Sequence, residues 1–403
     1  MSVTTAAAPA VQKTRAPGFV LAVAAVPAMT VGASAPSPFY PVLQQQFGFS
    51  AATSTVIFAV YAIALLATLL VTGSVSDHLG RRPVISLGFA VLAASMMVFW
   101  HADSVTELVV ARVVQGIATG LLMSSLSAAV VDLEPAGRPG LAATLNSVGP
   151  LGGLAVGALI SGSLLDQTSS APALALVFGG LTALYVAIAA AVWLLSETSP
   201  RHGGLRRSLV PRVGVPSAAR APFLRGAPAL FAGWATSGLY LSLGAPLVAQ
   251  ELGGTDHAEQ GLVVTALAGV GSVTCFVGRG MTSRTLTFYG TTALALGSAL
   301  SLVALAAGSF WGFVAAAVVA GSGFGASILG IMRSITPLAA PHERGELFAA
   351  VYIVSYLGFG APAIVAGVAA PHLGLAQTTY IYGGLVIVLS ASAALLHKLA
   401  HDG

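Results

Sequence analysis

A short charged loop, residues 73–83, separates two long apolar segments and holds the residues best placed to do chemistry. Its distinctive positions are Gly73, Asp77, Gly80, Arg81 and Arg82. A glycine takes a left-handed backbone conformation at little cost, which allows a tight turn at Gly80. A carboxylate that faces a helix N-terminus gains about 0.3–1 kcal/mol, so Asp77 is suited to such a contact. We expect the loop to make a conformational contact and to contain no catalytic residue.

Two partners for this loop can be named from the sequence. The apolar segment that begins near Arg344 is expected to start on the same side of the protein as the loop 73–83, so its N-terminus is the expected partner of Asp77. Asp132 ends another apolar segment and is expected to pair with Arg81. Together these contacts would latch the two halves of the protein on this side. The alternative is a solvated turn whose arginines only fix the orientation of the chain in a membrane.

Arg112 stands inside an apolar segment, 105–131, where a charge is costly. At 1.5 Å per residue it lies roughly 10 Å from the outer end of that segment. An arginine at the centre of a membrane helix costs about 2.5–3.5 kcal/mol on insertion scales, so its guanidinium must find acceptors inside the protein. Two interpretations stay open: Arg112 contacts a substrate or relays protons, or it is a structural residue bonded to Gln115 and to carbonyl groups of neighbouring helices.

Further candidates for a substrate passage are polar or aromatic residues inside the apolar segments. They are Tyr40, Asn146, Trp234, Tyr240, Tyr352 and Tyr356. Tyr352 and Tyr356 are four residues apart and therefore share one helix face. Aromatic faces with few polar groups suit amphipathic small molecules. The alternative for each of these residues is ordinary packing or a place at the membrane interface.

No aspartate, glutamate, lysine or histidine lies in the middle of any apolar segment. Proton-coupled transport usually needs a buried titratable group, and arginine does not lose its proton. If the chain is a transporter, a coupling group must therefore lie nearer an end, where Asp132, Glu134 and Glu346 are candidates, or transport proceeds without protons. A passage with one cation and no acid suits neutral or anionic substrates better than cations.

The elements that position these residues must be membrane helices. Of the 403 residues, 56% are hydrophobic and only 7% are charged. A soluble globular chain carries about 25% charged residues, so most of this surface must face lipid. The single cysteine, Cys275, excludes an intramolecular disulfide and a cysteine metal cluster. The basic residues form no contiguous patch for nucleic acid, and the chain has no motif of a metal site, a cofactor site or an enzyme.

A helix needs about 20 apolar residues to cross a bilayer. The twelve segments that qualify are 18–43, 52–75, 83–101, 105–131, 140–165, 172–196, 226–250, 259–281, 285–307, 310–335, 346–369 and 376–397. The sequence thus predicts an all-α integral membrane protein with twelve transmembrane helices in two pseudo-symmetric six-helix bundles. The predicted division is bundles at 18–196 and 226–397, a cytoplasmic Pro/Gly/Arg-rich linker at 197–225, and cytoplasmic tails at 1–17 and 398–403.

The charges sort by side of these predicted helices. Apart from Arg112, every lysine and arginine falls on the side of the linker and of both termini. The opposite loops carry only acids, namely Asp103, Glu107, Asp166, Glu251, Asp256 and Glu259. Cytoplasmic loops of membrane proteins are enriched in lysine and arginine. We therefore predict a multi-pass protein of the cytoplasmic (inner) membrane with both termini in the cytoplasm.

A weak internal repeat relates the two halves. Gly116 and Gly120 in the fourth segment match Gly321 and Gly325 in the tenth, at the same spacing. Parallel repeats of six helices on either side of a central linker are an architecture of secondary transporters. Glycines at this spacing also serve helix packing in any membrane protein.

Three motifs resemble those of one family, the major facilitator superfamily of transporters. Gly73-x-x-x-Asp77-x-x-Gly80-Arg81-Arg82 resembles its signature loop. Arg112, Gln115, Gly116 and Gly120 resemble its second motif, an arginine followed by a glycine-rich helix face. Gly149, Pro150, Gly152 and Gly153 resemble, one residue shorter, the Gly-Pro-x-x-Gly-Gly motif of its drug:proton antiporter branches. The resemblance implies roles in helix packing and gating for the glycines of the last two motifs and for Pro150.

The function expected from this resemblance is secondary active transport of small organic molecules by alternating access, as efflux with proton antiport. The expected partners are the lipid bilayer, a small-molecule substrate and protons, with the chain working as a monomer and without a cofactor. An uptake carrier or facilitator for a sugar or organic anion is the first alternative. A membrane sensor or scaffold that transports nothing is the second.

Overall fold

The computed structural model describes residues 10–199, 201, 203–340 and 343–402, and this part of the chain forms helices and short connections without any strand. Eleven of its helical segments are long and apolar enough to cross a membrane. The place of the remaining span, predicted at 226–250, is taken by α11 (Ser217–Ser242) and α12 (Gly244–Glu251). The predicted all-α membrane fold with twelve helices is confirmed.

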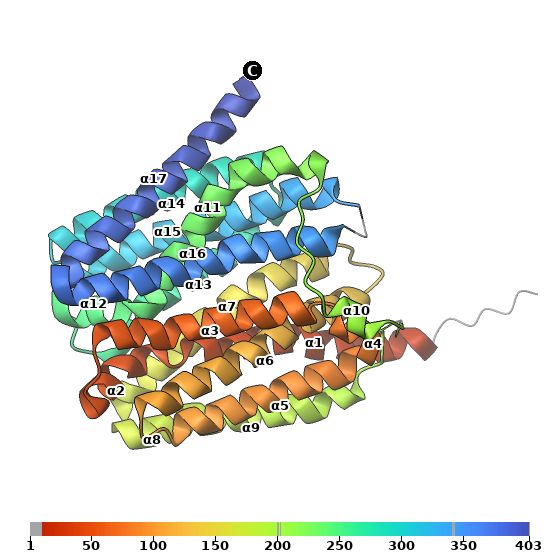
Figure 1. The fold of residues 1–403 in the computed structure, drawn as a ribbon, viewed down its shortest axis with the longest axis horizontal. Helices are drawn as coiled ribbons and strands as arrows, with labels where there is room; N and C mark the ends of the chain where they lie inside the picture. The colour runs from red at the N-terminus through yellow and green to blue at the C-terminus, as the bar shows by residue number, and fades with distance from the viewer. Residues whose placement is uncertain (1–9, 200, 202, 341–342, 403) are drawn as a thin grey trace, which may run out of the picture.

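The helices fall into two bundles joined by a linker (Figure 1). The N-terminal bundle contains α1 (Ala10–Ser34), η1 (Ser37–Phe39), α2 (Tyr40–Phe47), α3 (Ala51–Thr72), α4 (Val75–Leu79), α5 (Arg81–Trp100), α6 (Val105–Asp132), α7 (Leu141–Gln167), α8 (Ser170–Leu174), the π-helical turn η2 (Ala175–Gly179), α9 (Gly180–Ala191) and η3 (Val192–Leu194). The short helix α10 (Leu205–Ser208) lies in the linker. The C-terminal bundle contains α11, α12, α13 (His257–Val277), η4 (Gly278–Gly280), α14 (Ser283–Ala306), α15 (Phe310–Ile335), η5 (Thr336–Leu338), α16 (Arg344–Leu373) and α17 (Leu375–Asp402).

The long helices run between two ends of the molecule. Figure 1 shows α4 and α10 at one end and α2, α8 and α12 at the other. We call the end that carries the loop 73–83 and the linker the basic end. We call the opposite end, which carries Asp166 and Glu251, the acidic end.

Prolines interrupt two of the membrane-crossing segments. Helix α1 ends at Ser34, and η1 separates it from α2 where Pro36 and Pro38 stand. The seventh span breaks at Leu243, because Pro246 has no N–H to donate to the carbonyl of Ser242. The predicted segments, 18–43 and 226–250, are continuous at both places.

The repeated glycines make the same kind of helix contact within each bundle. A Cβ atom on Gly116 would lie 2.5 Å from the Tyr61 carbonyl oxygen of α3. In the second bundle, a Cβ atom on Gly321 or Gly325 would lie 2.2 Å from a carbonyl oxygen of α13. Side chains at these positions are excluded because the facing backbone leaves no room. The fourth long helix of each bundle therefore packs on the second in the same way, as the repeat predicts.

Three helix ends lie furthest beyond the predicted boundaries. Helix α1 begins at Ala10, inside the predicted tail 1–17. Helix α11 begins at Ser217, inside the predicted linker, and α17 continues to Asp402, beyond the predicted end at 397. A helix continues past its apolar stretch as long as the residues favour it, and alanine, leucine, lysine and arginine in these extensions do so.

Candidate functional site

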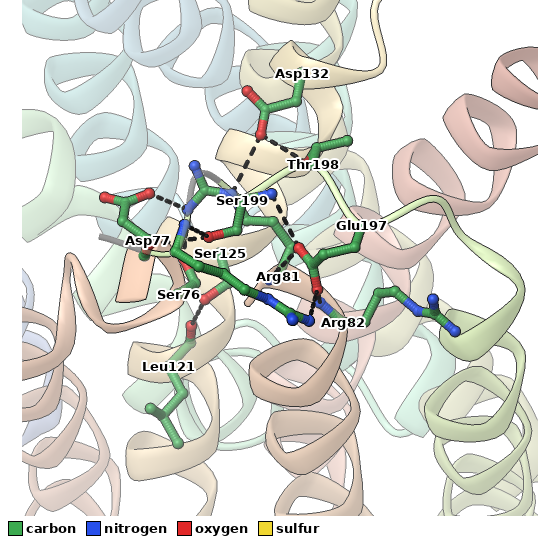
Figure 2. A network of polar contacts seen from close by, with 11 residues as sticks. Ser76, Asp77, Arg81, Arg82, Leu121, Ser125, Asp132, Glu197, Thr198 and Ser199 are labelled. Atoms are coloured by element: carbon green, nitrogen blue, oxygen red, sulfur yellow. Dashed lines mark hydrogen bonds and ion pairs between the residues drawn. The ribbon is translucent and has the colours of Figure 1, made fainter. Parts of the chain in front are cut away.

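The loop 73–83 forms a compact polar network at the basic end (Figure 2). Gly80 has φ +112°, so the predicted left-handed turn is present, and a Cβ atom there would lie 2.7 Å from Glu197 Oε2. Arg81 Nη1 lies 2.5 Å from Asp77 Oδ1, and Arg81 Nε lies 3.2 Å from Asp132 Oδ2. The predicted contact between Arg81 and Asp132 is therefore present. Arg81 also donates to Ser76 Oγ at 2.6 Å, so its guanidinium is held on three sides.

Asp77 does not make the contact expected of it. Within the described part of the chain its carboxylate pairs with Arg81 of its own bundle and not with α16. The first turn of α16 instead meets the linker, where Gly214 N donates to the Glu346 carbonyl at 3.3 Å. In this conformer Asp77 pairs within its own bundle because Arg81 is only four residues away in the chain, whereas α16 belongs to the other bundle.

Glu197 holds the loop from a position that the sequence analysis left in the linker. Its carboxylate accepts hydrogen bonds from the backbone N–H groups of Arg81 at 2.8 Å and Arg82 at 3.3 Å, the first turn of α5. Burial raises the pKa of Glu197, but bonds from the amides of Ser199, Arg81 and Arg82 and the nearby Arg201 charge outweigh it and hold the pKa below its usual range. The first N–H groups of a helix have no partners within it. The start of α5 at Arg81 therefore needs acceptors, and an acidic residue such as Glu197, at the same end of the predicted bundle, was the signal that could have revealed this contact.

The residues next to Glu197 complete this bracing. Thr198 Oγ1 donates to Asp132 Oδ2 at 2.8 Å, and Ser199 Oγ donates to the Asp77 carbonyl at 3.0 Å. Arg82 donates to the Trp193 carbonyl and lies over the Trp193 ring. Residues 193–199 thus fasten the loop to its own bundle.

Arg112 lies in a closed pocket inside the N-terminal bundle, with 1% of its surface exposed. Its Nε donates to the Tyr40 hydroxyl at 2.7 Å, and its Nη1 donates to Gln115 Oε1 at 2.7 Å and to the Ala33 carbonyl at 3.1 Å. The rings of Tyr40, Tyr61 and Phe99 surround the guanidinium at 5.4–5.5 Å. The Ala33 carbonyl and the Tyr40 hydroxyl lie where α1 breaks, and Gln115 lies one turn from Arg112 on α6. The geometry therefore favours the structural interpretation of Arg112, Gln115 and Tyr40.

An aromatic cluster lies where the two bundles meet. Trp234 of α11 is 5.6 Å from Tyr356 of α16 between ring centroids, and Tyr352 is 6.4 Å from Tyr356. The N-terminal bundle contributes Met123, whose sulfur accepts a hydrogen bond from the Tyr356 hydroxyl at 3.1 Å. It also contributes Phe58, whose ring is 4.7 Å from that of Phe359 on α16. Trp234 and Tyr352 are only half-buried, so the cluster is not closed off like the Arg112 pocket.

Two predicted passage residues lie outside this cluster. Tyr240 stacks on Phe313 at 5.4 Å and bonds Ser301 at 3.0 Å, inside the C-terminal bundle. Asn146 Nδ2 donates to the Ser127 carbonyl at 3.1 Å, which ties α7 to α6. Its Oδ1 is buried without a hydrogen bond to any described residue. Tyr240 is therefore a packing residue, and Asn146 keeps one free acceptor.

The glycines around Pro150 serve two contacts of α7. A Cβ atom on Gly153 would lie 2.2 Å from the Pro27 carbonyl oxygen, and one on Gly149 would lie 2.9 Å from the Val26 side chain, both on α1. Gly152 faces the other bundle, where a Cβ atom added to it would lie 3.3 Å from Ser272 Oγ of α13. The motif therefore packs α7 against its own bundle on one side and against the second bundle on the other.

A family model and several known proteins match parts of this chain. The family model of the Major Facilitator Superfamily matches residues 22–297. The inner membrane transport protein YnfM of Escherichia coli is 31% identical over 134 residues, or 32% of this chain and 31% of that protein. The multidrug efflux pump LfrA of Mycolicibacterium smegmatis is 31% identical over 128 residues, or 32% of this chain and 25% of that protein. The quinolone resistance protein NorA of Staphylococcus aureus is 22% identical over 98 residues, or 24% of this chain and 25% of that protein.

The chain thus spans at most 31% of the length of these three relatives. Solved structures match over almost the whole chain. An inward-facing, unoccupied bacterial homolog of the human lysosomal transporter Spinster superposes with a TM-score of 0.74 at 16% identity, covering 96% of this chain and 97% of that one. The inward-facing, occupied form gives a TM-score of 0.71. At this identity the likeness establishes the fold.

Proposed function

Because the chain belongs to the major facilitator superfamily, we propose that it moves small organic molecules across the cytoplasmic membrane by alternating access of its two bundles. The observation that supports this most is the aromatic cluster of Trp234, Tyr352 and Tyr356, which Met123 joins, because side chains of both bundles form it. A group placed between two bodies that move against each other can meet a molecule from either side in turn. We place the basic end in the cytoplasm, following the lysine and arginine distribution, and the protein works as a monomer.

The chemistry of the cluster favours neutral amphipathic substrates. Its groups are aromatic rings, one sulfur and tyrosine hydroxyls, which supply apolar contact and a few hydrogen bonds. The guanidinium of Arg112 is already bonded to protein acceptors, so it offers no free charge to an anion. All acidic residues lie at helix ends or in connections, so none offers a charge to a cation in the middle of the bundle.

Efflux is the direction we propose. The motif around Pro150 supports it, and so do two relatives, whose names describe a multidrug efflux pump and a quinolone resistance protein. Proton antiport would then use an acid at a helix end, where Asp132, Glu134 and Glu346 lie. The alternative is a facilitator or uptake carrier, which the lack of an acid in the middle of the membrane favours.

We propose that the loop 73–83 is a conformational latch formed when the basic ends of the bundles close. Asp77 is 37% exposed at its side chain, so it can meet an incoming helix start such as that of α16. Glu197 and Asp132 hold the loop rigidly for this contact.

Transport in proteoliposomes tests the proposed function. The purified chain is reconstituted, a pH gradient is imposed, and neutral, cationic and anionic amphipathic compounds are offered in turn. We expect transport of neutral compounds, and weaker apparent affinity in Trp234→Ala and Tyr356→Ala. Tyr289→Ala serves as the matched control, because Tyr289 is 45% exposed on the outside of α14. Transport of cations alone would refute the proposed class of neutral substrates. Transport unaffected by collapse of the gradient would refute proton antiport and indicate facilitated diffusion.

A further inference from the structure

The acidic end of the molecule holds a contact between the bundles that the sequence analysis did not foresee. Asp166, near the end of α7, meets the start of α13. Its Oδ1 accepts from the backbone N–H of His257 at 2.8 Å and lies 3.0 Å from His257 Nδ1. Its Oδ2 accepts from the backbone N–H of Ala258 at 2.7 Å. Both carboxylate oxygens are therefore used, and all their partners belong to the other bundle.

This contact replaces a cap that α13 does not make for itself. Asp256, the residue before the helix, makes no side-chain hydrogen bond to the first turn. The first N–H groups of a helix have no partners within it, and they attract negative charge. Asp166 supplies both the acceptor and the charge from a different helix, so part of the stability of the α13 start depends on the position of α7.

The two helices touch through their backbones at this end. A Cβ atom on Gly162 of α7 would lie 2.4 Å from the His257 carbonyl oxygen, and one on Gly261 of α13 would lie 2.4 Å from the Ala158 carbonyl oxygen. An aspartate side chain is short, so it spans this contact only while the helices are this close. Separation of the bundles at the acidic end must therefore break all the bonds of Asp166 together.

The charge distribution explains why an acid and a helix start were used here. By the predicted topology, the loops of this side contain no lysine or arginine, because a basic residue there would oppose the orientation of the chain. A contact between the bundles that needs a positive partner must then take it from backbone N–H groups. The start of α13, with the imidazole of His257 beside it, provides that partner without a basic loop.

We propose that Asp166 on the first turn of α13 is the gate of the acidic end. It holds the bundles together there in the present conformer, and it must release once in each transport cycle. This proposal rests on the alternating access proposed above. It makes Asp166 the counterpart of Asp77: each carboxylate belongs to the N-terminal bundle, and each would close its own end by meeting a helix start of the C-terminal bundle. In the present conformer only the contact of Asp166 forms, because Asp77 pairs with Arg81.

Distances between spin labels across the acidic end test the gate directly. Cys275 is buried and is replaced by alanine, and labels are attached at Ser169→Cys and Leu373→Cys, which are exposed positions on the two bundles. In Asp166→Asn we expect the long-distance population to rise about fivefold or more, the lower limit of a typical coupling between conformers. Asp256→Asn, which removes the same charge beside the same helix start, should keep the wild-type distribution.

Gly162→Ala keeps the test decisive if Asp166→Asn does not fold. The added methyl group meets the His257 carbonyl and pushes the helices apart while the carboxylate stays intact, so the long-distance population should rise again. Unchanged distances in a folded Asp166→Asn, or in a folded Gly162→Ala, would overturn the gate. The measurement needs neither substrate nor gradient. A wild-type protein that transports nothing would therefore refute the proposed function while the label distances still decide the gate.

Discussion

At the scale of single residues, the most conspicuous charge of the sequence is not exposed to the contact between the bundles. Arg112 donates to Tyr40, Gln115 and the Ala33 carbonyl, and three rings enclose it. The N–H groups of an arginine inside a membrane helix must find acceptors, and here the break in α1 and Gln115 of the same helix provide them. The cost of burying Arg112 suggested a functional role from the sequence alone. In the structure, its hydrogen bonds to protein groups offset this cost.

Replacement of Arg112 by alanine should mainly reduce stability. The Tyr40 hydroxyl, the Gln115 amide oxygen and the Ala33 carbonyl would lose their donor, and an unsatisfied buried polar group costs about 1–3 kcal/mol. We expect a markedly lower unfolding temperature in detergent and unchanged substrate affinity of the folded fraction. Arg138→Ala, at an exposed position, is the control. Wild-type stability with lost transport would instead give Arg112 a direct role in the passage.

Glu197 should make the stability of the basic end depend on pH. Because the pKa of Glu197 is lowered in the folded protein, its contribution is complete above the usual glutamate pKa of about 4.3 and is lost as the pH falls through the lowered value. The difference in unfolding temperature between wild type and Glu197→Gln should thus persist at neutral pH and shrink at acid pH. Glu251→Gln is the matched control at the other end. A difference that does not change with pH would contradict the bonds to α5.

At the scale of helices, small residues decide which faces meet. The two glycine pairs bring α6 onto α3 and α15 onto α13, with facing backbone in place of side chains. Without a hydrophobic difference between helix and lipid, such close approach is a main source of helix association in membranes. The internal repeat is therefore a repeat of packing surfaces, and it is visible in sequence only where glycine is required.

Two glycine substitutions should separate packing from helix propensity. Gly116→Ala places a methyl group 2.5 Å from the Tyr61 carbonyl oxygen and should lower the unfolding temperature. Gly384→Ala, in α17, meets no atom within 4 Å and should be neutral or stabilising, because alanine is favoured over glycine in a helix by about 0.5–1 kcal/mol. Thermal unfolding of both variants checks this. Equal effects of the two would show that the contact of α6 with α3 contributes little.

At the scale of the whole molecule, the proposed gate and the proposed latch use related contacts at opposite ends. The described contact at the acidic end is Asp166 on α13, whereas Asp77 at the basic end is paired within its own bundle. If each carboxylate stabilises the closure of its own end, the balance between them sets the resting conformer. In the proposed latch, the bracing by Glu197 keeps Asp77 in place for a contact with α16.

Asp77→Asn tests the latch at this scale. Loss of the charge should weaken closure of the basic end and slow transport by about fivefold or more, in the range of typical coupling energies. Expression and substrate binding should stay normal, because Arg81 keeps its contacts with Asp132 and Ser76. Asp103→Asn, at the acidic end, is the matched control. Unchanged transport would refute the latch.

Features that depend on residues close together in the chain could be predicted from the sequence, whereas most contacts between distant residues could not. The twelve spans, the turn at Gly80 and the contact of Arg81 with Asp132 were all accessible, because each depends on local composition or on a position at one end of a span. The break at Leu243, the capping by Glu197 and the contact of Asp166 were not. The last two join a carboxylate to backbone N–H groups distant in the chain, which any residue type can offer.

The sequence by itself determined that the chain is a membrane protein, where its helices cross, and which family it resembles. Apolar length, charge distribution and glycine-rich motifs carry this information because lipid acts on every segment separately. The tertiary structure alone decided which polar residues are available. It enclosed Arg112, gathered Trp234, Tyr352 and Tyr356 between the bundles, and paired Asp166 with α13. The reason is physical: a buried polar group takes the partner that packing brings within about 3 Å, and packing is a property of the whole fold.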